Sequence, residues 1–471
     1  MRSSRHPLAV VALLAASSLV LAADPPAKKK FGVDEIWAVS RVGTPALSPD
    51  GARVAYTVAT YDVEENRSNA DIWLLGLAGG APRRLTTNKA SDTSPAFSPD
   101  GRRLAFLSKR DGDAATELYV LPVDGGEPER VVDMPTSVAS PKWFPDGKKI
   151  AFLANVVSGA ESPEDTKKAL EKREKNKVKA RVTENRLYRY WDHWLTDEEF
   201  THLFVVDLAT KKVTDLTPKS RRILGLDEGG SFDIAPDGQS IAFSANSTPE
   251  PYATLNWDLF LVPAAGGEAR NLTPSRSVDD TNPVFSPDGR TIAFGTHAKA
   301  DGWPDYTRLA LLDVATGKVA LLTDGWEHGA GGWNFTKDGR VIVFTAEARA
   351  RTNVYAVPTT GGVPREIWKG GSASGPVVTP GGEVVFQRSD LNHPPELVSV
   401  KLDGTGFRAI TTVNDVLAAT WDLGAVKETT FRGAAGDDVQ MFVVYPPGFD
   451  AAKKYPLVHL VHGGPVGTFG D

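Results

Sequence analysis

The sequence predicts a mainly β protein, in which a seven-bladed β-propeller is followed by the first strands of a second, α/β domain. Three observations support this prediction. A turn motif related to Ser-Pro-Asp-Gly recurs seven times between residues 47 and 382. A short apolar strand follows each turn, and after residue 415 the repeat stops and another pattern begins. Repeats of roughly 40–50 residues with strand-like content are typical of propellers.

The turn motif is clearest at Phe285-Ser286-Pro287-Asp288-Gly289, which precedes the apolar run Ile292-Ala293-Phe294. Proline presets φ, aspartate hydrogen-bonds nearby backbone and glycine takes a positive φ, so the motif indicates a tight turn. The recurring aspartates are therefore interpreted as turn residues rather than as acids that line a channel. They are Asp50, Asp100, Asp146, Asp237, Asp288 and Asp338.

Each repeat carries its strands in the same order, which gives four short strands per unit. The first unit does not borrow a strand from the last, so we expect a ring closed without strand exchange. The interval from Asp146 to Asp237 is 91 residues, nearly double the others. This long interval predicts an insertion in blade three at residues 156–200.

Composition limits the possible functions. The net charge of −6 shows no basic bias, which argues against a nucleic-acid partner. The chain has no cysteine, so disulfides, thiolate metal sites and a cysteine nucleophile are excluded. We expect no cofactor and no metal site.

Residues 1–23 resemble a secretory signal peptide. Arg2 and Arg5 precede an apolar run from Leu8 to Leu21, and Ala22-Ala23 offers a cleavage site. The alternative is a membrane anchor, although the apolar run is short for a span of ~20 residues. We therefore expect a secreted or periplasmic protein without stable membrane association after cleavage. The propeller is assigned to residues 24–415 and the second domain to residues 416–471.

The first half of the insertion predicts a solvated helix from Ser162 to about Arg181. Ser162 is a suitable N-cap, Pro163 suits the first helical position and Asp165 follows three residues after the cap. The segment has almost no apolar face, which favours a surface arm.

The second half of the insertion, residues 187–194, is rich in aromatic residues. If it were one strand, Tyr188, Tyr190, Asp192 and Trp194 would share one face, and Arg189, Trp191 and His193 the other. One interpretation is an aromatic strand packed on the blade. The other is a ligand-recognition edge, since a carboxylate suits an amine and a guanidinium suits a carbonyl or carboxylate. Glu198 and Glu199 then belong to a turn or to an amine site.

The last part of the chain predicts three strands, at residues 428–431, 439–445 and 455–461. The third is almost wholly apolar, as in a strand covered on both faces, and it precedes His462-Gly463-Gly464-Pro465. This order is typical of the start of an α/β-hydrolase domain, where the loop after such a strand supplies an oxyanion-hole amide. Gly463 and Gly464 are the candidates, because glycine lets a backbone amide approach closely.

The propeller of Ser-Pro-Asp-Gly units, joined to Tyr-Pro-Leu-Val-His-Leu-Val-His-Gly-Gly-Pro, resembles the prolyl oligopeptidase family of serine peptidases. The His-Gly-Gly-Pro form and the Arg-Tyr-Trp-Asp-His-Trp insertion resemble its acylaminoacyl-peptidase and bacterial dipeptidyl-peptidase branch. The resemblance implies that the propeller admits short peptides to a serine nucleophile. It also implies that propeller acids hold the peptide N-terminus, with Asp192 as first candidate and Glu198 or Glu199 as second.

The resemblance also shows what is missing from this sequence. Such peptidases carry their serine in Gly-x-Ser-x-Gly, and no such motif occurs here. No residue can be assigned to a Ser-Asp-His triad, so we expect a fragment of the parent enzyme, truncated early in its catalytic domain and inactive by itself. The substrate-binding candidates are Arg189, Tyr190, Trp191, Asp192, Trp194, Glu198 and Glu199.

Two alternatives come from other classes of protein. One is a non-enzymatic periplasmic propeller that acts as a scaffold or binding protein, although such a protein has no need of residues 455–465. The other is a propeller enzyme that acts within its own channel, which needs converging acids or a metal.

Overall fold

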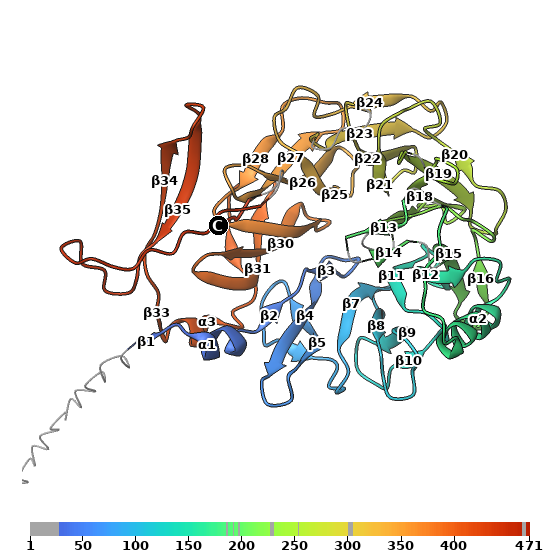
Figure 1. The fold of residues 1–471 in the computed structure, drawn as a ribbon, viewed down its shortest axis with the longest axis horizontal. Coiled ribbons are helices and arrows are strands. Elements are labelled where there is room, and N and C mark those ends of the chain that lie inside the picture. The colour runs from blue at the N-terminus through green and yellow to red at the C-terminus, as the bar shows by residue number, and fades with distance from the viewer. Residues whose placement is uncertain are drawn as a thin grey trace, which may run out of the picture.

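The computed structural model describes residues 28–184, 187–191, 193–195, 198–226, 230–252, 254–299, 305–463 and 468–471. Within them, seven antiparallel sheets of four or five strands surround a central opening (Figure 1). The predicted seven-bladed propeller is confirmed. Apart from the interruption in blade three, each blade is built from strands that follow one another in the sequence.

The blades have the following bounds. Blade one contains β2 (Arg41–Val42), β3 (Ala46–Leu47), β4 (Arg53–Asp62), β5 (Arg67–Gly76) and β6 (Arg83–Arg84). Blade two contains β7 (Asp92–Phe97), β8 (Arg103–Ser108), β9 (Glu117–Pro122) and β10 (Glu129–Arg130). Blade three contains β11 (Val138–Trp143), β12 (Lys149–Val157), β15 (Glu199–Asp207) and β16 (Val213–Asp215). Blade four contains β17 (Phe232–Ile234), β18 (Ser240–Asn246), β19 (Trp257–Pro263) and β20 (Arg270–Asn271).

The remaining blades repeat this arrangement. Blade five contains β21 (Asp280–Phe285), β22 (Thr291–Thr296), β23 (Arg308–Asp313) and β24 (Val319–Leu321). Blade six contains β25 (Ala330–Phe335), β26 (Val341–Glu347), β27 (Thr352–Pro358) and β28 (Arg365–Trp368). Blade seven contains β29 (Ser372–Val378), β30 (Glu383–Asp390), β31 (His393–Lys401) and β32 (Arg408–Ala409).

The turn motif has the predicted chemistry. The Ser286 hydroxyl donates to Asp288 Oδ1 at 2.6 Å, and this hydrogen bond lowers the pKa of the Asp288 carboxyl. Gly289 has φ +70°, and a Cβ there would lie 3.4 Å from Pro236 Cδ, in the turn of the preceding blade. Gly51, with φ +68°, lies in the same way against Pro380 of blade seven. Proline and glycine of successive turns therefore pack together, and this packing joins blade seven to blade one.

The core lies between neighbouring blades. In every blade, the strand that follows the turn motif carries an aromatic residue that is less than 2 % exposed. These residues are Tyr56, Phe106, Phe152, Phe243, Phe294, Phe344 and Phe386. One buried cluster combines Val42 and Tyr56 of blade one with Val385 and Leu397 of blade seven, so the apolar core is continuous around the ring.

The described strands of blades one and seven are not exchanged, which confirms the predicted mode of closure. Additional contacts lie outside the blades. Asn414 accepts from the Ser40 amide and donates to the Ser40 carbonyl, both at 3.0 Å. Two short strands, β1 (Lys29–Lys30) and β33 (Trp421–Asp422), pair in parallel, and Phe31 packs edge-on against Trp421. Hydrogen bonds, strand pairing and ring packing thus hold the segment before blade one against the segment after blade seven.

Three helices occur in the described residues: α1 (Val33–Ala38), α2 (Pro163–Lys175) and α3 (Asp415–Ala418). Helix α2 begins as predicted, because the Ser162 hydroxyl accepts from the Asp165 amide at 3.1 Å. It ends at Lys175 rather than near Arg181. Asn176 leaves the helical conformation there, and β-branched residues at 178, 182 and 183 disfavour its continuation.

After the propeller, β34 (Val426–Arg432) and β35 (Asp438–Val444) form the predicted antiparallel hairpin. The predicted strand at 455–461 is wrong, because these residues have no regular secondary structure. Leu457, Val458, Leu460 and Val461, expected to be buried, are 76–88 % exposed. A strand needs a neighbour for its backbone hydrogen bonds, and no described strand pairs with this segment.

Candidate functional site

The aromatic part of the insertion, residues 187–195, folds as a small hairpin, which we call the insert hairpin. Its strands β13 (Arg189–Tyr190) and β14 (His193–Trp194) are antiparallel, with Arg189 opposite Trp194. Trp191 lies at the turn, where its φ is +48°. The predicted single strand with two alternating faces is therefore wrong, because the turn at Trp191 folds the segment back on itself. Arg189 and Trp194, expected on opposite faces, lie together.

Two guanidinium groups approach the indole ring of Trp194. Arg181 Cζ lies 4.8 Å and Arg189 Cζ 5.3 Å from the ring centroid. Arg189 is oriented by its Nε, which donates to the Trp191 carbonyl at 2.7 Å. The ring of Tyr188 lies 6.0 Å from that of Trp194. Cation–π attraction keeps a guanidinium group close to an aromatic ring, so the hairpin presents a flat apolar surface beside positive charge.

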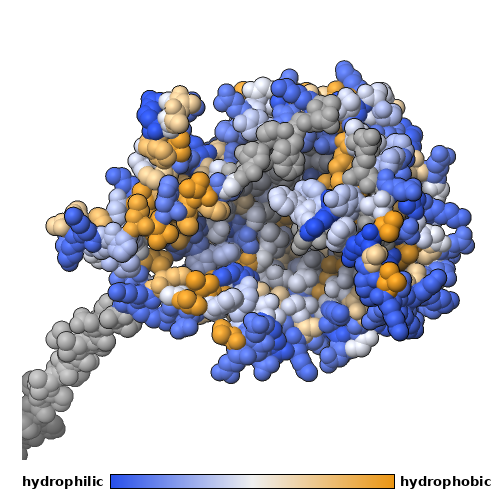
Figure 2. All heavy atoms as spheres, in the orientation of Figure 1, coloured by the Kyte–Doolittle hydropathy of each residue, from blue (hydrophilic) through white to orange (hydrophobic). Residues whose placement is uncertain are grey.

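The other two aromatic candidates differ in exposure, and Tyr190 is half-buried. Trp191 is 74 % exposed, and its ring meets Tyr190 edge-on at 6.2 Å. In the view of Figure 1, β13 and β14 lie at the inner margin of the ring, near the labels of β11 and β21. Figure 2 shows the same face of the molecule, which is hollowed towards its centre. The aromatic surface therefore borders the central opening.

The predicted acids differ in their surroundings. Glu199, at the start of β15, forms an ion pair with Arg173 at 2.6 Å. Glu198 is exposed, has φ +57° and accepts a hydrogen bond from the Ser158 amide through its carbonyl. Asp192, the first candidate for an amine, lies outside the described residues. The structure thus brings Arg189, Tyr190, Trp191 and Trp194 together, whereas Glu199 is paired with Arg173.

The base of the insertion is supported by blade four in a way that the sequence did not suggest. Phe200 packs with Ile223, Tyr252 and Trp257, and Leu187 of the insertion lies against this cluster. The Tyr252 hydroxyl donates to the Arg221 carbonyl at 2.7 Å. Phe200 and Trp257 lie at the starts of β15 and β19, whereas Ile223 and Tyr252 lie in connections between strands, so only their proximity in space reveals the group.

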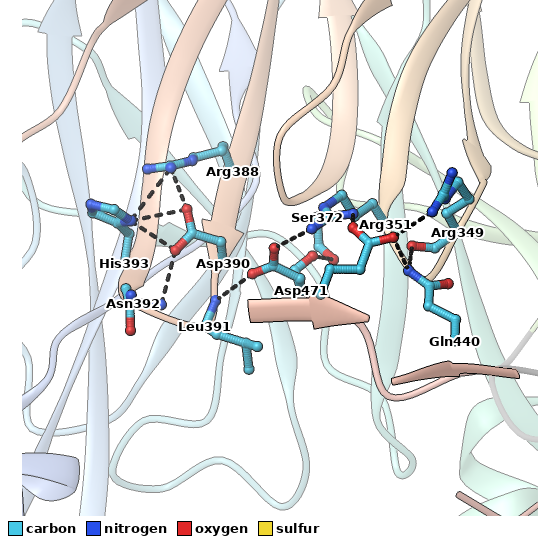
Figure 3. A network of polar contacts seen from close by, with 11 residues as sticks. Arg349, Arg351, Ser372, Arg388, Asp390, Leu391, Asn392, His393, Gln440 and Asp471 are labelled. Atoms are coloured by element: carbon cyan, nitrogen blue, oxygen red, sulfur yellow. Dashed lines mark hydrogen bonds and ion pairs between the residues drawn. The ribbon is translucent and has the colours of Figure 1, made fainter. Parts of the chain in front are cut away.

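A second polar network joins the propeller to the hairpin β34–β35 (Figure 3). Arg351 Nη1 donates to Glu428 Oε2 at 2.8 Å, and Arg351 Nη2 donates to Asp471 Oδ2 at 2.9 Å. Arg349 also pairs with Glu428, at 2.7 Å. Hydrogen bonds from the two arginines lower the pKa of the Glu428 carboxyl. The Arg351 guanidinium lies 5.2 Å from the ring centroid of Phe442 in β35.

Asp471 is held by three further groups of the propeller. Its amide donates to the Ala350 carbonyl at 2.9 Å, and its carbonyl accepts from the Ser372 hydroxyl at 2.9 Å. Asp471 Oδ1 accepts from the Leu391 amide at 3.1 Å. Residues 350–351, 372 and 391 come from blades six and seven, so these blades form one docking surface for the end of the described chain.

Replacing Arg351 with methionine should loosen the hairpin β34–β35. The change removes two charge-assisted hydrogen bonds at a side chain that is 23 % exposed, at a cost of about 1–3 kcal/mol to hairpin docking. Hydrogen exchange of residues 426–444 should accelerate, while that of β22 stays unchanged. The matched control is Arg349→Met, whose side chain is 74 % exposed and which should cost less than about 1 kcal/mol. Equal exchange in both variants would contradict a central role for Arg351.

Of the two oxyanion-loop candidates, the structure describes Gly463 alone. Gly463 is exposed, and a Cβ there would meet nothing within 4 Å. Gly464 lies outside the described residues. In the described part of the chain, no group of three or more His, Asp or Glu side chains is placed to hold a metal ion. No helix found there is long and apolar enough to cross a membrane.

Comparison with known proteins agrees with this architecture. The family model described as the TolB β-propeller domain matches residues 36–174. Dipeptidyl-peptidase 5 of Porphyromonas gingivalis is 29 % identical over 439 residues, which are 91 % of this chain and 63 % of that protein. The chain thus spans about three-fifths of the length of the curated relatives that it matches first.

Solved structures show the same fold. The acylaminoacyl peptidase of Pyrococcus horikoshii has a TM-score of 0.74 at 18 % identity, covering 94 % of this chain and 63 % of that one. The β-propeller domain of the trilobed protease from Pyrococcus furiosus, described as having an open velcro topology, has a TM-score of 0.55 at 18 % identity. It covers 80 % of this chain and 97 % of that one. The seven-bladed propeller and the likeness to dipeptidyl-peptidase 5 along 91 % of the chain support the predicted resemblance to the prolyl oligopeptidase family.

Proposed function

We propose that this chain is the substrate-gating propeller portion of a secreted serine peptidase that cleaves short peptides, of the dipeptidyl or acylaminoacyl type. The observation that carries the proposal is the likeness to dipeptidyl-peptidase 5 across 91 % of the chain. The Arg351 network supports it, because it fixes the hydrolase-type hairpin against blades six and seven. The signal-peptide pattern of residues 1–23 supports a location outside the cytoplasm.

The proposed selection of substrates by size follows from the ring shape of the propeller. A central opening bordered by the insert hairpin admits an extended peptide and excludes a folded protein, whose diameter exceeds that of a single chain. Arg189 suits a peptide carbonyl or carboxylate, and the exposed rings of Trp191 and Trp194 suit apolar side chains. Asp192 and Glu198 are the acids proposed for a peptide N-terminus, whereas Glu199 would first have to exchange its partner Arg173.

The reaction proposed for the complete enzyme is acyl transfer. A serine attacks the scissile carbonyl, a histidine moves the proton and backbone amides stabilise the oxyanion. Gly464 is proposed as one of these amides, with Gly463 shaping the loop. Since the 471 residues contain no Gly-x-Ser-x-Gly motif, we propose that they bind peptides without hydrolysing them.

This proposal predicts binding without turnover. The purified chain lacking residues 1–23 should release no p-nitroaniline from dipeptidyl or acylaminoacyl p-nitroanilides, whereas fluorescently labelled short peptides should bind to it. Measurable turnover that disappears on changing a single residue would overturn the proposed inactivity. Failure to bind any short peptide would favour the alternative, a propeller that acts as a scaffold for larger partners.

A further inference from the structure

His202, in β15 of blade three, forms two hydrogen bonds that need a proton on each ring nitrogen. The residue is 3 % exposed. Its Nδ1 lies 2.7 Å from Asp215 Oδ2, and its Nε2 lies 2.9 Å from the carbonyl oxygen of Ser220. A carbonyl oxygen only accepts hydrogen bonds, so Nε2 carries a proton. A second proton must lie between Nδ1 and the carboxylate, because two facing lone pairs at that distance would repel each other.

The second proton belongs to the imidazole near neutral pH. Two forms satisfy both contacts, an imidazolium beside a carboxylate or a neutral imidazole beside a protonated Asp215. A free aspartate loses its proton at about pH 3.9 and a free imidazolium at about pH 6.5, so the ion pair is the favoured form between these values. The Thr217 amide also favours it, since it donates to Asp215 Oδ1 at 2.8 Å. His202 is therefore a buried imidazolium with an acceptor at each nitrogen.

Other charged side chains around His202 have partners of their own. The ring is surrounded by β12, β15, β16, residues 217–226, which we call the supporting connection, and the segment before β11. The pairs are Glu199 with Arg173, Lys219 with Glu161, Arg221 with Glu250, Asp133 with Arg130, Arg222 with the Asn246 carbonyl, Asp207 with Thr210 and Lys149 with the Phe144 ring. Asp227 and Glu228 lie outside the described residues. A further acid near the ring would favour the same imidazolium.

The two hydrogen bonds fix the connection on which the insertion rests. Ser220, whose carbonyl accepts from the imidazolium, lies in the supporting connection. Ile223 of the same connection packs with Phe200, which lies two residues before the imidazolium in β15. Leu187 at the start of the insert hairpin lies against this cluster. The imidazolium therefore ties the strand that follows the insertion to the connection that supports its base.

We infer that His202 is a positioning residue for peptide binding, because its imidazolium holds the supporting connection in place beneath the insert hairpin. This inference rests on the proposed function and adds a dependence on pH. When the imidazolium loses a proton, one ring nitrogen faces an acceptor without a hydrogen, and a buried hydrogen bond is lost. The contact is complete while both protons are present and is lost as pH rises. The insert hairpin should therefore loosen, and peptides should bind more weakly, as pH rises from about 6 to about 9.

Blade four contains a version of the contact that uses an amide. Asn271 occupies the place of Asp215, where its Oδ1 accepts from a backbone amide at 2.9 Å and its Nδ2 donates to Asp258 at 2.6 Å. Asp215→Asn should copy this arrangement in blade three. Its amide nitrogen would donate to Nδ1 of a neutral His202, whose Nε2 still donates to the Ser220 carbonyl. This variant keeps both hydrogen bonds and removes the need for a second ring proton.

The first test measures peptide binding and hydrogen exchange in the chain lacking residues 1–23, at about pH 6, 7.5 and 9. The probe is a fluorescently labelled, C-terminally amidated hexapeptide of uncharged residues, so that the ligand does not titrate. It should bind roughly three- to tenfold more weakly at the highest pH than at the lowest. Exchange protection of residues 187–191 and 217–226, corrected for the intrinsic rate at each pH, should fall by a similar factor.

Three variants assign the effect to the imidazolium. Asp215→Asn should bind the peptide at every pH as the parent chain does at the lowest. His202→Gln, which has one donor group for two acceptors, should bind at every pH as weakly as the parent chain does at the highest. The matched control is His393→Gln in blade seven, where the ring lies 2.7 Å from Asp390, and this variant should keep the pH dependence of the parent chain.

The second test counts the ring protons directly. In the ¹⁵N-labelled chain at about pH 6, His202 should give two ring N–H signals, assigned by their loss in His202→Gln. Asp215→Asn should give one such signal at neutral pH. A single ring N–H signal for the parent chain would show a neutral imidazole and overturn the inference.

The possible results separate the two proposals. If the peptide binds at no pH, the proposed function fails, and the exchange data alone decide the role of His202. If the peptide binds but neither its affinity nor the protection of residues 217–226 changes with pH, the positioning role is overturned while the proposed function stands. The same conclusion follows if Asp215→Asn keeps the pH dependence of the parent chain, or if His202→Gln binds as tightly as the parent chain at the lowest pH.

Discussion

Replacing Phe294 with alanine should destabilise the propeller by about 3–5 kcal/mol. Phe294 is 0 % exposed and packs with Leu259, Ile292, Ala310 and Leu312, at the interface of blades four and five. Deleting its ring leaves a cavity that rigid strands on both sides cannot fill. Because each blade of a repeat protein is stabilised mainly by its neighbours, the loss should lower the midpoint of thermal or urea unfolding.

Two variants test whether burial is the cause. Phe294→Leu keeps most of the apolar volume and should cost less than about 1.5 kcal/mol. Phe407→Ala removes the same side chain from a position that is 53 % exposed, and it should change stability by about 0.5 kcal/mol or less. A loss for Phe407→Ala as large as that for Phe294→Ala would contradict the assignment of Phe294 to the core.

Glu117 should make the stability of blade two depend on pH. Its side chain is buried, and burial raises its pKa from the ordinary value of 4.5 to about 8. The Met134 amide, which donates to the carboxyl at 3.0 Å, and Arg130 oppose this shift, whereas Asp113 and Asp133 add to it. The folded chain therefore binds a proton that the unfolded chain releases above pH 4.5. The free energy of unfolding should fall as pH rises from 4.5 to 8 and be independent of Glu117 above that.

Glu117→Gln should remove this dependence. Glutamine keeps an oxygen for the Met134 amide and carries no charge, so the variant should equal the parent chain near pH 4.5 and exceed it near pH 8. The expected difference near pH 8 is on the order of 3 kcal/mol, measured by urea unfolding across the pH range. Glu127→Gln, which removes a charge from an exposed position in the same blade, should leave the slope unchanged. A Glu117→Gln variant with the parent slope would show that Glu117 titrates normally.

Glu117 also shows that blades with the same sequence pattern differ in the partner of the side chain at this position. At the equivalent place in blade one, Asp71 pairs with Arg84, and in blade three His202 contacts Asp215 at 2.7 Å. In blade four, Asp258 accepts from Asn271 at 2.6 Å. For Glu117, the hydrogen bonds within the described residues come from the Met134 amide alone. The sequence pattern marks the position, but only the structure shows which copy lacks a side-chain partner.

Much of the fold could be predicted because its causes are local. The Ser286-Pro287-Asp288-Gly289 turn forms through hydrogen bonds and φ preferences within a few residues, and the strand after it follows from its apolar run. Repetition of this unit predicted the number of blades. The segment 455–461 shows the limit of the same reasoning. Its composition is that of a buried strand, yet it forms none, because a strand needs neighbours that a composition cannot supply.

The candidate site was predicted only in part. Its aromatic and charged residues stood out by their density, but their faces were assigned wrongly, because the turn at Trp191 places Arg189 opposite Trp194. The support from Ile223, Tyr252 and Trp257 joins residues of blades three and four that no pattern relates. Proximity of this kind arises from packing between blades.

The sequence by itself therefore determined the propeller, its seven units, the mode of closure and the place of the insertion, since these follow from turn chemistry and strand periodicity. Only the tertiary structure decided which charges meet. Arg351 reaches Glu428 and Asp471, which lie 77 and 120 residues further along the chain, because ring closure brings blades six and seven beside the hairpin that follows them. Side-chain pairing over such separations depends on the packed positions of whole blades, and local preferences carry no information about it.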